Sequence, residues 1–350
     1  MRALALVCLA MIGCSSGDDS NGASTDAGSS PGNDSSVGSS DSGTTNPNDG
    51  GAGVDASTPK GPVVVYASGY GTDITVYAAD TAATTLTKKS SVAAGDTSPS
   101  FLAMRPGDAN LYAVSEASPT GRVGAYSVDA TSGALTYLSG VSSQGNGPAF
   151  LSVDPSGKYV LVANYGDGGI AVLPIQSDGK LGTPTDTRNA GKNAHMMIAD
   201  ASDKYVFVPC LGSDYVAQYT FDASTGTLSP NTPPTFSMPA KSGPRHLALH
   251  PNGKWAYLVS ETSSSITSLT ISATGTLGNA VTQTTVPGTF KGKNTDAEVV
   301  VHPSGKWVYA SNRGDDSIAI FAVDATNGTL TPTGTTKTGG KTPRSFAVDP

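Results

Sequence analysis

The sequence predicts an all-β protein, a β-propeller built from four-stranded blades, and two observations support this prediction. From residue 61 onward, short apolar runs with an alternating pattern recur, and no long stretch shows helical periodicity. A turn that usually contains proline returns about every fifty residues, a spacing typical of propeller blades. The turn positions are Pro106, Pro155, Ala201, Pro251, Pro303 and Pro350.

Each repeat contains four predicted strands, A to D, in the same order. Residues 243–261, GPRHLALHPNGKWAYLVSE, show two alternating apolar runs on either side of a Pro-Asn-Gly-Lys turn, which indicates a hairpin of strands A and B. Strand C follows a loop rich in Gly, Ser and Asp, and strand D follows a Gly-x-Leu turn. Aromatic residues at one position of strand B are predicted to pack between blades: Tyr159, Tyr205, Trp255 and Trp307.

The two ends of the repeat region predict an incomplete ring. Residues 62–70 align with strand B, so the first blade lacks its own strand A, and residues 344–350 form a strand A with its turn proline. This last strand could close a ring of six blades. However, Pro350 begins a turn that elsewhere leads directly into strand B. We therefore expect a seven-bladed propeller over residues 61–350, truncated at the start of the last blade and left with an exposed edge.

Residues 1–14 are predicted to be a signal peptide. Arg2 precedes an apolar run, residues 3–13, that is too short to span a bilayer and has the length of a signal-peptide core. The run ends in Met11-Ile12-Gly13-Cys14, which resembles the lipobox of bacterial lipoproteins. This resemblance implies cleavage before Cys14, acylation of Cys14 and attachment to the cell envelope, with Ser15 indicating the outer membrane if the cell is Gram-negative. The alternative is an ordinary secretory signal with an incidental cysteine.

Residues 15–60 are predicted to be a disordered tether, because a segment of Ser, Gly, Asp, Asn and Thr buries too little apolar surface to fold. The tether holds seven aspartates and one lysine, so it supplies most of the net charge of −7. The propeller is therefore nearly neutral, which predicts no nucleic-acid partner and no basic membrane-binding face. Cys210 is left alone once the signal is cleaved and Cys14 is acylated, so it can form no disulfide.

Polar residues at the strand ends are predicted to ring the mouth of the central channel. In a propeller blade, the start of strand A and the end of strand B open on the same face. The starts of A strands carry His195, Arg245, His246, Glu298 and Arg344. The ends of B strands carry Glu116, Glu261, Asn312 and Arg313. His250 and His302 precede the turn proline on the opposite face and are predicted to be turn or surface residues.

Several blade motifs resemble those of the lactonase-type seven-bladed propellers. The motifs are Ser98–Leu102, Asn193-Ala194-His195, Gly243–His246, Ser260-Glu261, Ala297-Glu298, Ser311–Gly314 and Pro343–Phe346. That family includes bacterial 6-phosphogluconolactonases and fungal carboxy-muconate-cyclising enzymes. The resemblance implies hydrolysis of a small-molecule lactone such as a sugar lactone. Because the chain is predicted to be exported, we expect the lactone to be extracytoplasmic.

The polar ring contains the groups that lactone opening needs, which are a base, an acid and donors for the carbonyl oxyanion. We expect Glu298 or Glu261 to be the base, with a histidine, His195 or His246, as acid or base. The arginines would hold the oxyanion or a substrate anion: Arg245, Arg313 and Arg344.

Three alternatives remain open from the sequence: a small-ligand pocket without chemistry, a cell-surface propeller that binds a protein partner, and a muconate-type cycloisomerase. A strongly shifted carboxyl or histidine pKa would favour chemistry, whereas arginine-paired carboxylates with low pKa values would favour a structural role. The sequence predicts no cofactor and no metal site, because no close set of His, Asp and Glu stands out. We also expect a monomer.

Overall fold

The computed structural model describes residues 2–5, 63–80, 82–107, 109–117 and 120–348. The predicted lipidation site Cys14, the predicted tether over residues 15–60 and the turn residue Pro350 lie outside these ranges. In the part of the chain that the structure describes, no helix is long and apolar enough to cross a membrane.

The described residues form six four-stranded sheets, which we number as blades 1 to 6. Blade 1 contains β1 (Arg2–Ala5), β2 (Val63–Ala67), β3 (Asp73–Asp80) and β4 (Thr85–Ala93). Blade 2 contains β5 (Phe101–Met104), β6 (Asn110–Ser115), β7 (Arg122–Val128) and β8 (Leu135–Ser142). Blade 3 contains β9 (Pro148–Val153), β10 (Tyr159–Asn164), β11 (Gly169–Pro174) and β12 (Asp186–Asn189).

Blade 4 contains β13 (Ile198–Ala199), β14 (Tyr205–Cys210), β15 (Tyr215–Asp222) and β16 (Thr227–Ser237), with the short 3-10 helix η1 (Leu211–Ser213) between β14 and β15. Blade 5 contains β17 (Pro244–Leu249), β18 (Trp255–Ser260), β19 (Ser265–Ile271) and β20 (Leu277–Thr284). Blade 6 contains β21 (Asp296–Val301), β22 (Trp307–Asn312), β23 (Ser317–Val323) and β24 (Leu330–Lys337).

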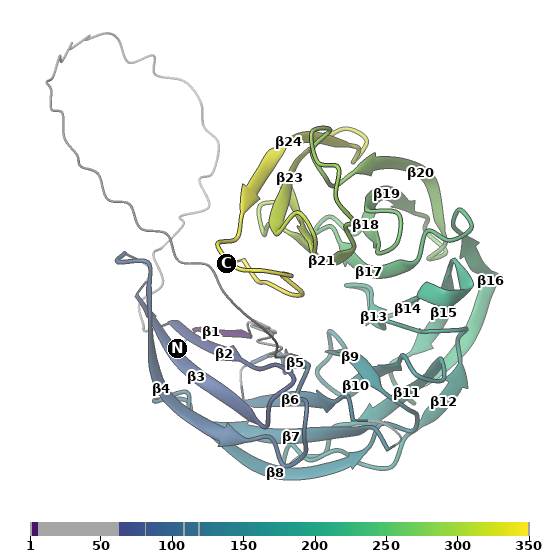
Figure 1. Ribbon diagram of the computed structural model, residues 1–350. Coiled ribbons are helices and arrows are strands. Elements are labelled where there is room, and N and C mark those ends of the chain that lie inside the picture. The colour runs from purple at the N-terminus through teal and green to yellow at the C-terminus, as the bar shows by residue number, and fades with distance from the viewer. Residues whose placement is uncertain (1, 6–62, 81, 108, 118–119, 349–350) are drawn as a thin grey trace, which may run out of the picture. The chain divides into compact units, whose positions relative to one another are not determined.

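The sheets follow one another around a common centre, with the first strand of each blade innermost (Figure 1). In blades 2 to 6 each strand pairs antiparallel with the next one along the chain. The all-β class and the four-stranded blade are thus confirmed. The Gly-x-Leu turns also lead into the fourth strand as predicted, with Leu135 starting β8 and Leu330 starting β24.

Aromatic residues at the start of the second strand pack against the next blade, as predicted. Trp255 begins β18, and a Cβ atom added to Gly328 of blade 6 would lie 2.3 Å from its Cδ2 atom. Gly328 also has a φ of +76°, which glycine adopts without strain. In the same way, a Cβ atom added to Gly226 of blade 4 would lie 2.4 Å from the Cε1 atom of Tyr159. Trp307 of blade 6 occupies the equivalent position and is 37% exposed.

The described residues form six four-stranded sheets, and of the seventh blade the sequence predicted only a first strand. Residues 344–348 follow β24 without a partner strand among the described residues, so no seventh ladder forms there. The first blade also contains a strand that the sequence did not predict. Arg2–Ala5, assigned to the signal peptide above, pairs parallel to β2, where the backbone groups of β2 would otherwise have no neighbour on that side.

Candidate functional site

Seven polar and aromatic side chains line a pocket of about 160 Å³, which we call the mouth pocket. They are Glu116, Tyr165, His195, Arg245, Glu261, Arg313 and Arg344. Glu116, Tyr165, Glu261 and Arg313 directly follow second strands and Arg245 lies at the start of β17, whereas His195 precedes β13 by three residues and Arg344 lies after β24 outside any strand. The structure therefore brings together five of the seven residues proposed from the sequence. The other two, His246 and Glu298, do not line this pocket.

Glu261 joins two arginines in the wall of the mouth pocket. Its Oε2 atom accepts a hydrogen bond from Arg245 Nε at 2.9 Å and lies 2.8 Å from Arg313 Nη2. Arg245 is only 1% exposed, and its Nη1 atom also donates to the carbonyl oxygen of Ala297 at 2.7 Å. Burial and the nearby Arg313 lower the pKa of Arg245 to about 10, so the guanidinium stays charged at neutral pH. The guanidinium of Arg245 is therefore a positive group held in a fixed position.

A second pair closes the other side of the pocket. Arg344 Nη2 donates to Glu116 Oε2 at 3.1 Å, and the guanidinium lies 4.9 Å from the ring centre of Tyr70. Burial raises the pKa of Glu116, although Ser100 and Arg245 act in the opposite direction. Sequence reasoning placed Glu116 at the mouth without a role. The available signal was its place in the repeat, because Ser115-Glu116 matches Ser260-Glu261.

His195 supplies a neutral imidazole to the pocket wall. The side chain is 5% exposed, and burial together with the charge of Arg245 holds the pKa of His195 well below its usual value. Its Nδ1 atom is buried and has no hydrogen-bond partner among the described residues. The ring lies 5.4 Å from that of Tyr165 and 5.0 Å from that of His246, measured between ring centres. His195 is thus a neutral imidazole at neutral pH, and its surroundings oppose the positive charge that protonation would bring.

His246 and Glu298 form a buried pair away from the pocket lining. The distance from His246 Nδ1 to Glu298 Oε1 is 2.8 Å, and the residues are 2% and 6% exposed. Burial raises the pKa of Glu298, but His246 and Ser345 outweigh it, so the net shift is downward. Burial also lowers the pKa of His246. The pair is therefore a neutral imidazole bonded to a carboxylate.

This geometry changes the role expected for Glu298, which we had considered as the base. Its Oε1 atom also accepts from the backbone N–H of Val299 at 3.1 Å, and its Oε2 atom accepts from Ser345 Oγ at 2.8 Å. Both oxygens are engaged and buried, so the carboxylate does not meet a ligand in the mouth pocket. Glu261 is likewise occupied by two arginines. Glu116 is paired with one arginine, Arg344, and burial raises its pKa.

The residues that line the mouth pocket and the residues buried behind them occupy two consecutive positions of the repeat. The register of β17 against β18 shifts between Pro244 and His246, which leaves Arg245 at the extra position of a bulge; Arg245 lines the pocket and His246 does not. The position of His246 is occupied in the other blades by Phe101, Phe150, Met196 and Glu298, and by Ser345 after β24, each two residues after a proline, alanine or aspartate. The rings of Phe101 and Phe150 lie 5.9 Å and 5.1 Å from His246, between ring centres.

A family model described as "Lactonase, 7-bladed beta-propeller" matches residues 62–350. The chain belongs to this lactonase family. It is 32% identical over 301 residues to a Bacillus subtilis protein named 6-phosphogluconolactonase, which covers 83% of this chain and 85% of that protein. A protein of the same name from Pectobacterium carotovorum is 32% identical over 199 residues, covering 57% of this chain and 59% of the relative.

Two solved structures are also similar to this lactonase-family chain. The periplasmic gluconolactonase of Pseudomonas aeruginosa has a TM-score of 0.75 at 29% identity, covering 81% of this chain and 85% of that one. A putative 6-phosphogluconolactonase from Bacteroides fragilis has a TM-score of 0.76 at 28% identity, covering 85% of this chain and 87% of that one. The resemblance inferred from the blade motifs is thereby confirmed at the level of the family.

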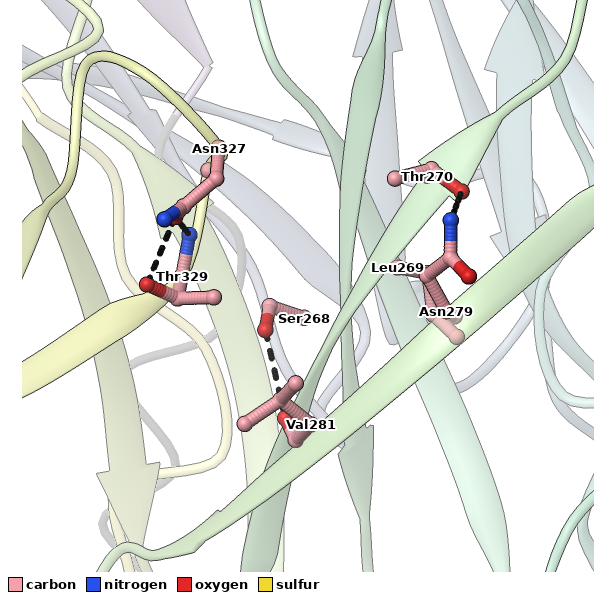
Figure 2. A pocket seen from close by; sticks show the side chains of 8 residues that line it. Ser268, Leu269, Thr270, Asn279, Val281, Asn327 and Thr329 are labelled. Atoms are coloured by element: carbon pink, nitrogen blue, oxygen red, sulfur yellow. Dashed lines mark hydrogen bonds between the residues drawn. The ribbon is translucent and has the colours of Figure 1, made fainter.

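A second pocket, of about 230 Å³, lies between blades 5 and 6 of this family member (Figure 2). Its polar groups bond to one another: Ser268 Oγ donates to the carbonyl oxygen of Val281 at 3.2 Å, and Asn279 Nδ2 donates to Thr270 Oγ1 at 3.2 Å. No titratable side chain lines it. The pocket therefore offers no group for acid–base chemistry, and the mouth pocket is the candidate site.

Within the described ranges, no group of three or more His, Cys, Asp or Glu residues is placed to hold a metal ion. The carboxylates of the mouth pocket are paired with arginines, and those positive charges oppose a bound cation. Cys210 is buried, and burial raises the pKa of its thiol to about 12. Cys210 is therefore a packed core residue with little thiolate at neutral pH.

Proposed function

We propose that the protein hydrolyses a small lactone in the mouth pocket. The observation that carries this proposal is the meeting of three arginines, a neutral histidine and a carboxyl of raised pKa in one small pocket. Family membership supports it, as do relatives named 6-phosphogluconolactonase and gluconolactonase. By the criterion stated above, the shifted His195 and Glu116 favour chemistry, whereas the pairing of Glu261 has a structural component.

The arginines are suited to stabilising the oxyanion. When a water oxygen bonds to the lactone carbonyl carbon, the carbonyl oxygen becomes negatively charged, and donors held in place beforehand stabilise it. Arg245 is fixed by Glu261 and by the carbonyl oxygen of Ala297, so it needs little reorganisation during the reaction. Its Nε and Nη1 atoms are engaged in these bonds, which leaves Nη2 for the substrate.

His195 is suited to moving the proton. Its neutral imidazole takes the proton from the attacking water, and the resulting imidazolium gives it to the ring oxygen as the carbon–oxygen ester bond breaks. A low pKa makes that imidazolium a strong donor to the leaving alkoxide. The product is the open hydroxy acid. Glu116 is the second candidate for the base, because its raised pKa brings it closer to neutral pH than an ordinary glutamate.

The charges of the mouth pocket suit a ligand with at most one negative charge. Three arginines face two glutamates, and no lysine lines the pocket. This small excess of positive charge matches one oxyanion or the carboxylate of the product. The volume of about 160 Å³ is below the roughly 300–1,000 Å³ typical of drug-sized ligands, which points to a small substrate.

The test is acid release measured by pH-stat with five- and six-membered lactones and the full chain. His195→Gln is expected to lower turnover about 100-fold or more, the usual range for loss of a proton-transfer group. Glu116→Gln tests the second candidate base. His302→Gln is the matched control, because His302 lies at the turn between β21 and β22, outside the mouth pocket, and its imidazole hydrogen-bonds to Ser304. Turnover that is unchanged in His195→Gln and in Glu116→Gln would contradict this mechanism.

We further propose that the protein is exported and attached to the outer membrane through a lipid on Cys14. The Met11–Cys14 pattern supports this, and one similar structure is named as a periplasmic protein. Signal cleavage would remove β1. We expect the propeller to persist, because the ladder between β1 and β2 is four residues long. Intact mass of the membrane-fraction protein, with and without Cys14→Ser, tests the anchor, and a soluble protein retaining Met1 would contradict it.

A further inference from the structure

A buried chain of hydrogen bonds runs beside the mouth pocket through three equivalent positions of the repeat. Ser345 Oγ donates to Glu298 Oε2 at 2.8 Å, and Glu298 Oε1 lies 2.8 Å from His246 Nδ1. The exposed fractions are 8% for Ser345, 6% for Glu298 and 2% for His246. Sequence reasoning gave Ser345 no role.

The chemistry of the three groups fixes the direction of the hydrogen bonds. An ionised carboxylate accepts only, so His246 must donate to Glu298 from Nδ1. A neutral imidazole carries one proton, which leaves a lone pair on its Nε2 atom. That Nε2 atom is buried and has no hydrogen-bond partner among the described residues. The chain therefore holds His246 in one tautomer.

The far end of this chain reaches the proposed proton-transfer group. The ring of His246 lies 5.0 Å from that of His195, between ring centres, with the two planes at 70°. The rings of Phe101 and Phe150 also pack against His246, so its orientation is constrained. The negative charge of Glu298 thus lies behind His195 at the moment when His195 would take up a proton. A protonated His246 would instead oppose that proton transfer.

We propose that Ser345 is a positioning residue, which holds Glu298 as a carboxylate so that His246 stays neutral with its Nδ1 atom protonated, supporting the positive charge that develops on His195. The last part of this proposal rests on the proposed lactonase function. Ser345 follows Arg344 directly, so one short segment supplies an arginine to the pocket and a serine to the chain behind it.

The test compares Ser345→Ala with Ser345→Thr, which keeps a hydroxyl group. Ser68→Ala is the matched control, because Ser68 is equally buried, at 8% exposed, and its hydroxyl has no partner among the described residues. Removing the donor makes the carboxylate a stronger base, so the Glu298–His246 pair takes up a proton at higher pH. NMR titration of the histidine imidazoles in ¹⁵N-labelled full chain should show this shift as about one pH unit in Ser345→Ala.

Turnover supplies a second readout. The acidic limb of the pH profile of kcat/KM should move upward in Ser345→Ala, and kcat should fall more than KM changes, because the lost support acts in the transition state. Ser345→Thr should restore both. If Ser345→Ala does not fold, Glu298→Gln tests the next member of the chain: loss of the carboxylate should move proton uptake by His246 to lower pH and lower kcat, since an amide side chain cannot supply the negative charge.

The outcomes separate this proposal from the lactonase function. A shifted imidazole titration in a protein that hydrolyses no lactone would support the positioning of His246 by Ser345 and reject the proposed function. A His246 protonated on Nε2 and bare on Nδ1 in the parent protein would overturn the proposal. So would a Ser345→Ala titration that matches that of Ser68→Ala.

Discussion

Glu261→Gln tests the electrostatics of the mouth pocket most sharply, because one carboxylate serves two arginines. The substitution keeps the shape of the side chain and removes its charge. Arg245, at 2% side-chain exposure, then remains in the interior with neutral acceptors at these bonds, the amide oxygen of the new side chain and the carbonyl oxygen of Ala297. Arg313 also loses its ion pair at 2.8 Å. Positive charges left without compensation in a buried site destabilise the fold.

The expected loss can be bracketed from the exposure of the groups. Removing one partner of a fully buried pair costs about 3–5 kcal/mol, whereas an exposed pair contributes about 0–1 kcal/mol. Glu261 and Arg313 are 22% and 21% exposed, so an intermediate loss of about 2–4 kcal/mol in the free energy of unfolding is expected. For a protein of this size the melting temperature should fall by roughly 4–8 °C.

Urea unfolding followed by fluorescence measures this loss. Asp178→Asn is the control, since the Asp178–Lys180 pair has the same 2.8 Å separation but side chains that are 51% and 44% exposed. Adding Arg313→Gln to Glu261→Gln removes one of the stranded charges and should recover about 1 kcal/mol, which a double-mutant cycle would reveal. If Glu261→Gln were as stable as Asp178→Asn, the reasoning about the buried network would be wrong.

Three further predictions concern stability, each measured by urea unfolding. Burial holds the pKa of Asp296 well above its usual value, so its contribution to stability is complete only below the ordinary aspartate pKa of about 3.9 and declines as pH rises above it; Asp296→Asn should match the parent near pH 3 and exceed it by a growing margin from pH 5 to pH 7. Burial and the Asp154 carboxyl raise the pKa of Asp203 to about 6, so the parent should lose stability as pH rises through 6. Asp203→Asn should remove that loss, a gain on the order of 1 kcal/mol at pH 8 after allowing for solvent screening, and a pH-independent difference would argue against it. Gly328→Ala should lower the free energy of unfolding by about 2–4 kcal/mol, because of its left-handed φ and the clash with Trp255. Gly339→Ala is the control, since Gly339 has φ +72° and open space around it, and should lose about 1 kcal/mol. Equal losses in the two variants would show that the clash contributes nothing.

The sequence predicted the blades because two signals repeat along the chain, the alternation within strands and the spacing of the turns. It also predicted which strand ends meet, since that depends only on topology. The sequence did not predict which of these side chains line the mouth pocket and which are buried behind it. Arg245 and His246 are consecutive, and the pairing of β17 with β18 is irregular between Pro244 and His246, so alternation alone does not say which side chain reaches the pocket.

Contacts between distant residues were also beyond the sequence. The pairing of Glu298 with Ser345 joins positions 47 residues apart, and that of Arg344 with Glu116 joins positions 228 apart. Neither contact leaves a pattern in the local sequence from which it could be predicted. The parallel pairing of Arg2–Ala5 with β2 was missed for another reason, because an apolar run behind one arginine is typical of a signal peptide and also has the composition of a strand.

The most direct test of the central claim is lactone hydrolysis by the full chain, measured against the spontaneous rate in the same buffer. A six-membered sugar lactone and its phosphorylated counterpart should be compared, each with the parent protein and with Arg245→Gln. The charges of the mouth pocket predict turnover above the spontaneous rate, preference for the unphosphorylated lactone and a loss of about 100-fold or more in Arg245→Gln. Hydrolysis no faster than the spontaneous rate with either lactone would contradict the account.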